Sequence, residues 1–242
     1  MSEIDLPALG TTLLVWAHPD DETYLSGGTA AALVASGQRV VAVTATRGEA
    51  GGPDLTPAGR RALAELRTTE LDAALGVLGV TEHVWLGYED GRCAEADPEP
   101  AVARLVELIA QVRPDTLVTF GPDGFTGHPD HRTVSRWVDL ALARSETCAP
   151  RLLHAVSVPA DRVDPRLDED FGVFDLGEPR ICGPDEVALR HVLEEGPLSR
   201  KVLALRAQAS QTSGLVEAVG IDRFTAWVSV ESFADPVRVP AH

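Results

Sequence analysis

Histidine and aspartate side chains gather in two short segments of this sequence. The first reads His18-Pro-Asp-Asp-Glu22 and the second reads His128-Pro-Asp-His131. Imidazole nitrogens and carboxylate oxygens are ligands that suit zinc, and a catalytic zinc site keeps three protein ligands and one open position for water. The same side chains carry out many of the proton transfers in enzymes. Together the two segments predict a metal-assisted hydrolysis.

The spacing within the segments divides the roles. We expect His18, Asp21 and His131 to bind the metal, because two histidines and one carboxylate meet the ligand count of a catalytic zinc site. Asp20 is then left beside the metal as the general base that takes a proton from the zinc-acidified water. His128, when protonated, would stabilise the oxyanion or protonate the leaving amine.

Plainer roles compete with these. Asp130 is placed to orient one of the neighbouring imidazoles as an outer hydrogen-bond partner. An aspartate directly before a helix is usually its N-cap, so Asp20 or Asp21 alone would indicate only a helix start. Chemistry is favoured because two such clusters occur, each after a predicted strand and before a predicted helix. We interpret as core or surface residues four other histidines, His83, His154, His191 and His242.

The clusters need a scaffold that brings them together, and the predicted elements supply one. Apolar runs alternate with segments of helical periodicity, which indicates an α/β fold with a doubly wound, mostly parallel sheet and helices on both faces. In a strand order of 3-2-1-4-5, the first and fourth strands are neighbours, and ligands bind between their carboxyl ends. The predicted strands are 11–17, 39–46, 83–86, 116–120 and 152–158, and the predicted helices are 25–34, 57–78, 101–112, 133–143 and 198–208.

The length of 242 residues and a hydrophobic content of 44% predict a single catalytic domain over 1–242. Two glycine-rich loops, 47–57 and 121–131, are too long to be mere connectors, and such loops tend to carry function. Segment 159–196 is rich in proline, aspartate and glutamate and is weakly periodic. We expect this segment to be a variable excursion or cap.

Charge and cysteine content restrict the partners and the compartment. A net charge of -16 and a pI near 4.7 argue against nucleic acid or an anionic membrane as the main partner. The sequence has no signal-peptide pattern and no apolar stretch of about 18 residues, so no membrane span is expected. Three widely spaced cysteines fit a reducing, cytoplasmic location. Acidic α/β enzymes of this size often self-associate, so a homo-oligomer is compatible with the sequence.

Six segments carry a family resemblance: AHPDDE at 17–22, GHPDHRTV at 127–134, TRGEAG at 46–51, RTTELDAALGVLGV at 67–80, YEDG at 88–91 and KVLALRAQASQ at 201–211. They resemble the PIG-L/LmbE-like zinc de-N-acetylases, which include N-acetylglucosaminyl deacetylases of the phosphatidylinositol-glycan, mycothiol and bacillithiol pathways. The resemblance leaves 159–196 unmatched. It implies a Rossmann-like fold, Zn²⁺ as cofactor with Fe²⁺ able to replace it in the cell, and a small-molecule amino-sugar substrate.

The resemblance implies the same metal, base and histidine roles and adds three residues. It implies that Glu49, Arg67 and Asp90 line the pocket and touch sugar hydroxyls or fix the loops. The ordinary alternative for Arg67 is an i,i+3 surface ion pair with Glu70. One position departs from the family: some of its sugar deacetylases have a tyrosine two residues before the first histidine of HPDH, where it helps polarise the carbonyl, whereas this chain has Thr126.

We therefore expect a zinc-dependent hydrolase that removes an N-acetyl group from an N-acetylglucosamine-type amino-sugar derivative. Thr126 and the acidic segment 159–196 favour an alternative, a zinc amidase or N-deacylase acting on S-conjugates or natural-product amides. A third hypothesis is a non-catalytic α/β sugar-binding protein. A dinucleotide site would require GxGxxG after the first strand, and HPDDETYLSGG stands there instead, which argues against that form of binding protein.

Overall fold

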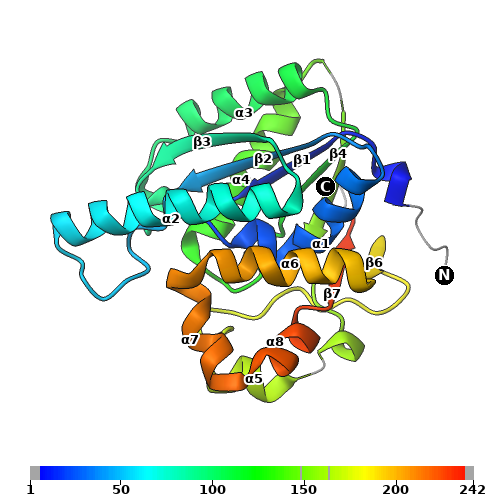
Figure 1. Ribbon diagram of the computed structural model, residues 1–242. Helices are drawn as coiled ribbons and strands as arrows, with labels where there is room; N and C mark the ends of the chain where they lie inside the picture. Colours follow the sequence, from blue (N-terminus) through cyan, green and yellow to red (C-terminus); the bar gives the residue numbers. More distant parts are fainter. Residues whose placement is uncertain (1–5, 148, 163, 238–242) are drawn as a thin grey trace.

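A seven-stranded sheet forms the centre of the computed structural model, which describes residues 6–147, 149–162 and 164–237 (Figure 1). The strand order is β3-β2-β1-β4-β5-β7-β6. The first five strands are parallel, and β7 runs antiparallel to both β5 and β6. The α/β class and the predicted order 3-2-1-4-5 are confirmed. The strands are β1 (Thr12–Trp16), β2 (Val40–Thr46), β3 (Glu82–Tyr88), β4 (Thr116–Phe120), β5 (Arg151–Ala155), β6 (Leu189–Val192) and β7 (Val230–Ala234).

The central strands are buried along their whole length. Every residue of β1, β2 and β4 is buried, as expected for parallel strands covered on both faces. At the ends of β1 and β4, the rings of Trp16 and Phe120 meet edge to face with centroids 4.7 Å apart. Phe120 also stacks on the ring of His131, at 4.1 Å between centroids. The core side chain Phe120 therefore contacts His131, one of the residues that the sequence predicted to bind metal.

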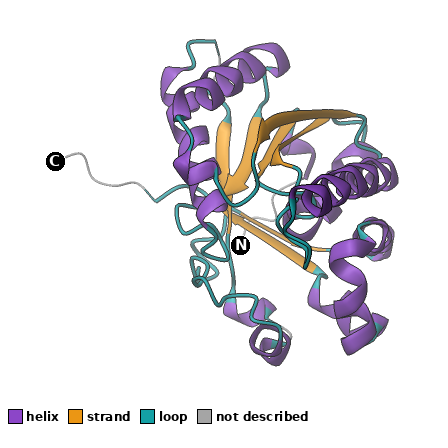
Figure 2. Cartoon of the chain, turned by 90° about the vertical axis from the view of Figure 1, so that its left-hand side faces the viewer, coloured by secondary structure: helices purple, strands orange, loops and turns teal. Residues whose placement is uncertain are grey.

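Helices cover both faces of the sheet (Figure 2). On one face α6 packs against α1 and α2, and on the other face α3 packs against α4. None of the helices in the described ranges is both long and apolar enough to cross a membrane. The helices are α1 (Asp21–Ala35), α2 (Pro57–Leu78), α3 (Pro98–Val112), α4 (Pro129–Arg144), α5 (Pro165–Asp170), α6 (Glu195–Ala207), α7 (Ala209–Val219) and α8 (Ile221–Trp227), with short 3₁₀ turns η1 (Leu6–Leu9), η2 (Cys93–Glu95) and η3 (Pro159–Asp161).

Four helices, α1, α3, α4 and α6, begin three or four residues earlier than the sequence predicted, and the early starts of α1 and α4 position site residues. α1 begins at Asp21 rather than at residue 25, and α4 begins at Pro129 rather than at residue 133. Proline suits the first helical turn, because its missing N–H has no partner there in any helix. His128 is the N-cap of α4, and its Nδ1 accepts a hydrogen bond from the backbone N–H of Asp130 at 3.2 Å. Asp21 and His131 consequently lie in the first turns of their helices.

Segment 159–196 contributes more regular structure than its composition suggested. It contains η3, α5 and the edge strand β6, which pairs with β7 from Leu189 opposite Phe233 to Val192 opposite Val230. These elements, and also α7, α8 and β7, were not predicted from the sequence. In Figure 1 α5 lies beside α8, away from the sheet, whereas β6 belongs to the sheet. Segment 159–196 thus consists of η3 and α5 outside the sheet, followed by β6 within it.

Candidate active site

The two clusters meet at the carboxyl ends of β1 and β4, which are neighbours in the sheet. Nδ1 of His18 and Nε2 of His131 lie 3.1 Å apart. One carboxylate faces both rings. Oδ2 of Asp21 lies 3.5 Å from Nδ1 of His18, and Oδ1 lies 3.5 Å from Nε2 of His131. The structure therefore brings the three sequence-predicted metal ligands together.

The outer nitrogen of each ring has an acceptor of its own. Nδ1 of His131 lies 2.9 Å from the carbonyl oxygen of Gly124, so it carries the proton and Nε2 keeps a free lone pair. Nε2 of His18 lies 3.1 Å from Asp90 and 3.3 Å from Asp130, so it donates there and Nδ1 faces His131. Burial opposes protonation of the His18 ring, but hydrogen bonds to Asp130, Asp21 and Asp90 raise its pKa well above the usual value. These tautomers are assigned from the hydrogen-bond partners. Two lone pairs 3.1 Å apart repel each other unless a proton or a metal cation lies between them.

A metal cation fits this donor set. One ring nitrogen each of His18, His128 and His131 lie within 4.8 Å of one another, and so do one ligand atom each of His18, Asp90 and Asp130. Two nitrogens 3.1 Å apart can bind one zinc ion, because each Zn–N bond is about 2.0–2.1 Å long. Carboxylates on the far nitrogen of His18 are the usual outer partners of a metal-bound imidazole. The described residues thus include a His/Asp group that could hold a metal.

The charges in this group also suit a cation. Burial opposes ionisation of Asp21, but His131 and His18 outweigh it and lower the pKa of Asp21 to about 2. The backbone N–H of His18 donates to Oδ2 of Asp21 at 2.8 Å. Burial lowers the pKa of His131 to about 4, although Asp21 opposes the shift. At neutral pH the pair is therefore a carboxylate and a neutral imidazole, the forms that bind metal.

Asp20 occupies a strained turn immediately before α1. Its φ is 97°, a region that non-glycine residues seldom adopt and that costs on the order of 1–3 kcal/mol. Two side chains hold the turn. Oε2 of Glu22 accepts the backbone N–H of Asp20 at 3.0 Å, and Nη2 of Arg67 donates to Oδ2 of Asp20 at 3.1 Å and to the carbonyl oxygen of Pro19. The side chain of Asp20 makes no capping hydrogen bond, so the N-cap alternative does not account for it.

Neighbouring carboxyl groups differ in proton affinity at this turn. Burial raises the pKa of Asp20 to about 7, although Arg67 opposes the shift. Burial likewise raises the pKa of Glu22 to about 7, where it accepts hydrogen bonds from Thr23 and Gln208. A carboxyl group with a pKa near neutrality is able to take up and return a proton. Asp20 and Asp21 therefore have properties suited to different tasks, as paired catalytic carboxylates do.

His128 lies beside the two histidines that face each other. Its ring centroid lies 4.8 Å from that of His18 and 5.0 Å from that of His131. Because Nδ1 accepts the backbone N–H of Asp130, the proton of the neutral ring is on Nε2. Burial and the neighbouring His18 lower the pKa of His128. The neutral ring, a hydrogen-bond donor at Nε2, is therefore favoured over the protonated form that the sequence hypothesis invoked.

The predicted outer residues form a network behind His18. Asp130 accepts the backbone N–H groups of Gly91 at 2.8 Å and Cys93 at 3.0 Å, in addition to its contact with His18. Hydrogen bonding to His18 and to Gly91 lowers the pKa of Asp130 against the opposing effect of burial. The carboxylate is therefore anionic and orients the imidazole, as the sequence suggested for one of the neighbouring rings.

Asp90 and Glu49 extend this network to the loop after β2. Oδ1 of Asp90 lies 3.1 Å from Nε2 of His18, and Oδ2 accepts the backbone N–H of Ala50 at 2.7 Å. Burial opposes ionisation of Asp90, yet His18 lowers its pKa to about 2. Oε1 of Glu49 accepts the backbone N–H of Asp90 at 3.0 Å. The contacts that the structure gives these two residues fix loops around His18.

Arg67 is not part of a surface ion pair with Glu70. Its side chain is buried and donates to the carbonyl oxygen of Gly48 at 2.8 Å as well as to Pro19 and Asp20. Glu70 instead accepts hydrogen bonds from Ser210 on α7. Gly48 has a positive φ, and a Cβ there would collide with the guanidinium of Arg67. The surface-pair alternative is therefore wrong, and Arg67 joins the loop after β2 to the turn at Asp20.

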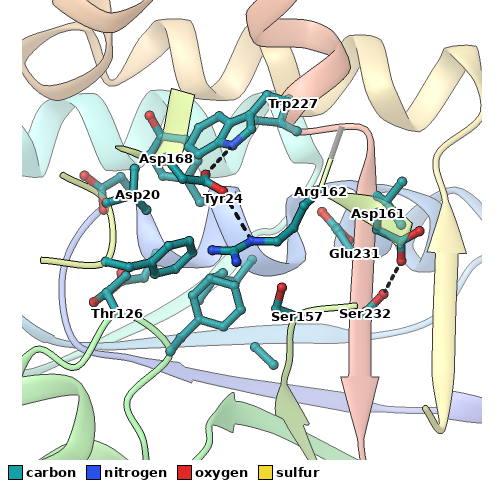
Figure 3. A pocket seen from close by; sticks show the side chains of 18 of the residues that line it. Asp20, Tyr24, Thr126, Ser157, Asp161, Arg162, Asp168, Trp227, Glu231 and Ser232 are labelled. Atoms are coloured by element: carbon teal, nitrogen blue, oxygen red, sulfur yellow. Dashed lines mark hydrogen bonds and ion pairs between the residues drawn. The ribbon is translucent and has the colours of Figure 1, made fainter. Parts of the chain in front are cut away.

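A cavity of ≈ 590 Å³ opens beside these groups. Asp20, Asp21 and His131 line it, together with many residues that the sequence did not single out. Figure 3 shows Arg162 extending across the cavity toward the side where Asp20 and Thr126 lie. Residues that sequence reasoning missed come from α1, from segment 157–174 and from α6 to β7; they include Tyr24, Ser157, Arg162, Asp168, Phe174, Lys201, Trp227 and Glu231.

Thr126, the departure from the family pattern, also lines this cavity. Its Oγ1 lies 3.3 Å from Nδ1 of His131, which already has the carbonyl oxygen of Gly124 at 2.9 Å. The residue before it, Phe125, has a φ of 61° and lies next to Phe174, with ring centroids 6.1 Å apart. The loop therefore turns an aromatic ring, rather than a phenol, toward segment 157–174.

Comparison with known proteins places the chain among deacetylases. Residues 13–142 match the family model described as GlcNAc-PI de-N-acetylase, PIG-L. A 1D-myo-inositol 2-acetamido-2-deoxy-alpha-D-glucopyranoside deacetylase of Acidothermus cellulolyticus is 35% identical over 229 residues, which cover 82% of this chain and 78% of the relative.

Solved structures share the fold at low sequence identity. The N,N'-diacetylchitobiose deacetylase from Pyrococcus horikoshii superposes with a TM-score of 0.62 at 21% identity, over 95% of this chain and 86% of that one. The 4-carboxy-2-hydroxymuconate hydratase from Pseudomonas putida superposes with a TM-score of 0.65 at 17% identity, over 96% and 98%. The fold thus hosts more than one chemistry, so function has to be argued from the site. The family match and the Acidothermus relative decide the classification: the chain belongs to the PIG-L family of de-N-acetylases and is an amide hydrolase by family.

Proposed function

We propose that this protein is a zinc-dependent de-N-acetylase that hydrolyses the acetamide of an N-acetylglucosamine derivative. The observation that carries the proposal is the 3.1 Å approach of Nδ1 of His18 to Nε2 of His131, with the carboxylate of Asp21 facing both nitrogens. These three side chains would hold the metal. Nitrogen and oxygen ligands suit Zn²⁺, and Fe²⁺ is also compatible with them.

The chain's own residues supply the remaining chemistry. Zinc, when bound, would acidify a water molecule and polarise the amide carbonyl. Asp20, whose pKa is raised to about 7, takes a proton from the attacking water and returns it to the leaving amine. Nε2–H of His128 donates a hydrogen bond to the oxyanion, which is a role for a neutral imidazole. Arg67 keeps the carboxylate of Asp20 in place.

The outer residues support these groups. Asp130 and Asp90 accept the proton of Nε2 of His18, so that Nδ1 of that ring stays free for the metal. Glu49 holds Asp90 through its backbone, and its other carboxylate oxygen, Oε2, is buried with no hydrogen-bond partner among the described residues. Glu49, Arg67 and Asp90 are not among the residues that line the cavity, so we assign them to holding the loops and not to sugar hydroxyls.

The substrate class rests on the relatives. The Acidothermus protein is named for a 2-acetamido-2-deoxy-glucopyranoside linked to inositol, and we transfer to this chain the acetamido-glucose part of that name. Membership of a family of amide hydrolases disfavours a purely sugar-binding role. The amidase alternative keeps the same metal and base and differs in the group that the cavity accepts.

The experiment measures hydrolysis and metal together. Purified protein is freed of metal, reloaded with Zn²⁺ or Fe²⁺, and incubated with N-acetylglucosaminyl-inositol and simpler N-acetylglucosaminides while acetate and primary amine are quantified. We expect release of both products in equal amounts, about one bound metal per chain, and recovery of activity on reloading. Stoichiometric metal without acetate release from any of these compounds would refute the deacetylase assignment, and activity without metal would refute the zinc assignment.

A further inference from the structure

The walls of the cavity are aromatic beyond the group formed by His18, Asp21 and His131. Tyr24 and Trp227 meet with ring centroids 5.8 Å apart, and Phe125 and Phe174 meet at 6.1 Å. All four rings line the cavity. Aliphatic side chains complete the surface: Leu25, Val156, Val173, Leu215, Val228 and Val230. Ring faces and aliphatic carbons thus form much of the surface beyond Asp20 and His131.

The carboxylates Asp168 and Glu231 of this region already accept hydrogen bonds from the protein. Asp168 accepts the indole N–H of Trp227 at 3.0 Å and lies 3.3 Å from Nε of Arg162. Glu231 accepts two backbone N–H groups of α1 and lies 2.8 Å from Nζ of Lys201. These buried carboxylates therefore have hydrogen bonds without a ligand. A sugar ring would need several unpaired polar groups, whereas an apolar group needs none.

Arg162 gives this region a flat boundary. Its guanidinium lies over the ring of Phe174, 4.6 Å from the centroid, and Asp168 fixes the side chain from the other direction (Figure 3). Arginine planes and aromatic faces both stack on flat groups. Phe174 and Trp227 come from outside residues 13–142, the part that matches the family, so this wall is a feature of the chain beyond the shared motifs.

We propose that this part of the cavity, where the rings of Tyr24, Phe125, Phe174 and Trp227 form the walls, is a binding subsite for a flat apolar substituent of the substrate, of at least phenyl size. The proposal rests on the deacetylase function and narrows its substrate class. A volume of ≈ 590 Å³ is that of a pocket for a drug-sized ligand and greatly exceeds the needs of an acetyl group. The substituent belongs either to the amine side of the amide, as an aglycone, or to its acyl side.

The test uses two matched pairs of compounds. Methyl and phenyl N-acetylglucosaminides vary the amine side, and N-acetyl- and N-phenylacetyl-glucosamine vary the acyl side. We expect the phenyl member of one pair to have a kcat/KM about 10- to 100-fold higher than its partner, which corresponds to the burial of one ring. The pair that shows the preference identifies the side of the amide that enters the subsite.

Variants tie the preference to the rings. In Phe174→Ala and in Trp227→Ala, the phenyl preference should fall to within threefold of unity. Leu176→Ala is the matched control, because Leu176 belongs to the same segment but is 62% exposed. It should retain the full preference. A wild-type preference that survives both aromatic substitutions, or equal turnover of all four compounds, would overturn the subsite and leave the deacetylase assignment intact.

Binding measured by titration calorimetry separates the two proposals. If no compound is hydrolysed but a phenyl compound binds at least tenfold more tightly than its partner, and Phe174→Ala abolishes the difference, the subsite stands and the deacetylase assignment fails. If no compound is hydrolysed and none shows a phenyl preference in binding, the subsite is refuted together with that assignment.

Discussion

Arg67 and Asp20 form a partly buried ion pair across 47 residues of sequence, with Nη2 of Arg67 3.1 Å from Oδ2 of Asp20. The same guanidinium binds the carbonyl oxygens of Pro19 and Gly48. One side chain therefore holds the strained backbone before α1 and the loop after β2. The position of the candidate base depends on a residue of α2 that is remote from the cluster in sequence.

Replacing Arg67 by methionine should damage both stability and turnover. The substitution leaves the carboxylate of Asp20 and two carbonyl groups without their donor, and breaking a partly buried ion pair in this way costs about 3 kcal/mol. We expect that loss in the free energy of unfolding measured with urea, and a kcat at least tenfold lower because the turn relaxes. Glu65→Gln, at an exposed residue of the same helix, serves as the control and should change neither quantity appreciably. A full kcat in Arg67→Met would show that Asp20 needs no such support.

The Asp20→Asn variant tests the base directly. Asparagine keeps the size of the side chain and a hydrogen-bond acceptor for Arg67 but cannot take up a proton, so kcat should fall by about 10²- to 10⁴-fold. Metal content, measured by plasma mass spectrometry, should remain that of the wild type because Asp20 is not among the proposed ligands. Asp54→Asn, at an exposed carboxylate in the loop before α2, is the matched control. Loss of metal in Asp20→Asn would instead make Asp20 a ligand.

The sequence predicted that the two His/Asp segments would meet, and it did so for a physical reason. Parallel strands end at the same edge of the sheet, so a histidine two residues beyond β1 and another at the start of the helix after β4 are expected to lie close together once the order 3-2-1-4-5 is inferred. His18 and His131 meet as that argument requires. The burial of Arg67 could not be predicted in that way, because its guanidinium lies against Gly48 at a distance that leaves no room for a Cβ.

The walls of the cavity were unpredictable for a different reason. Segment 159–196 has no sustained periodicity, and its side chains are positioned by long-range partners: Asp168 by Trp227, and Asp164 by Arg223 on α8. Lys201 is similarly non-local, since its ion pair joins α6 to Glu231 on β7. Lys201 is the only lysine in the chain, yet nothing in its sequence neighbourhood marks it as buried. Contacts between residues far apart in sequence produce no local sequence pattern from which they could be predicted.

Metal binding should stabilise the fold, because a preformed site exists only in the folded protein. At a free Zn²⁺ concentration about 100 times the dissociation constant, linkage predicts about 2.7 kcal/mol of stabilisation, or a Tm higher by about 5–10 °C for a chain of this size. Differential scanning fluorimetry of the metal-free protein with and without Zn²⁺ measures the shift. In His131→Ala the shift should shrink to under about 2 °C. An unchanged shift in that variant would place the bound ion elsewhere.

His154 should make the fold sensitive to acid. It is 3% exposed on β5, and its Nε2 has no hydrogen-bond partner among the described residues. Burial lowers its pKa to about 4, although Asp123 opposes the shift. The unfolded chain, with an ordinary pKa of about 6.5, therefore takes up a proton first as the pH falls. Stability should decline from about pH 6.5 to about pH 4, by at most about 3 kcal/mol from this residue, and level off below.

The His154→Leu variant isolates that contribution. Leucine is apolar and does not titrate, so the difference in unfolding free energy between pH 7 and pH 4.5 should be about 2 kcal/mol smaller than in the wild type. Only this difference is compared, because the substitution also alters packing at neutral pH. Leu152→Val on the same strand perturbs packing without removing a titratable group and should keep the wild-type difference. If His154→Leu kept it as well, the histidine would have to titrate normally in the folded protein, which would mean that water reaches β5.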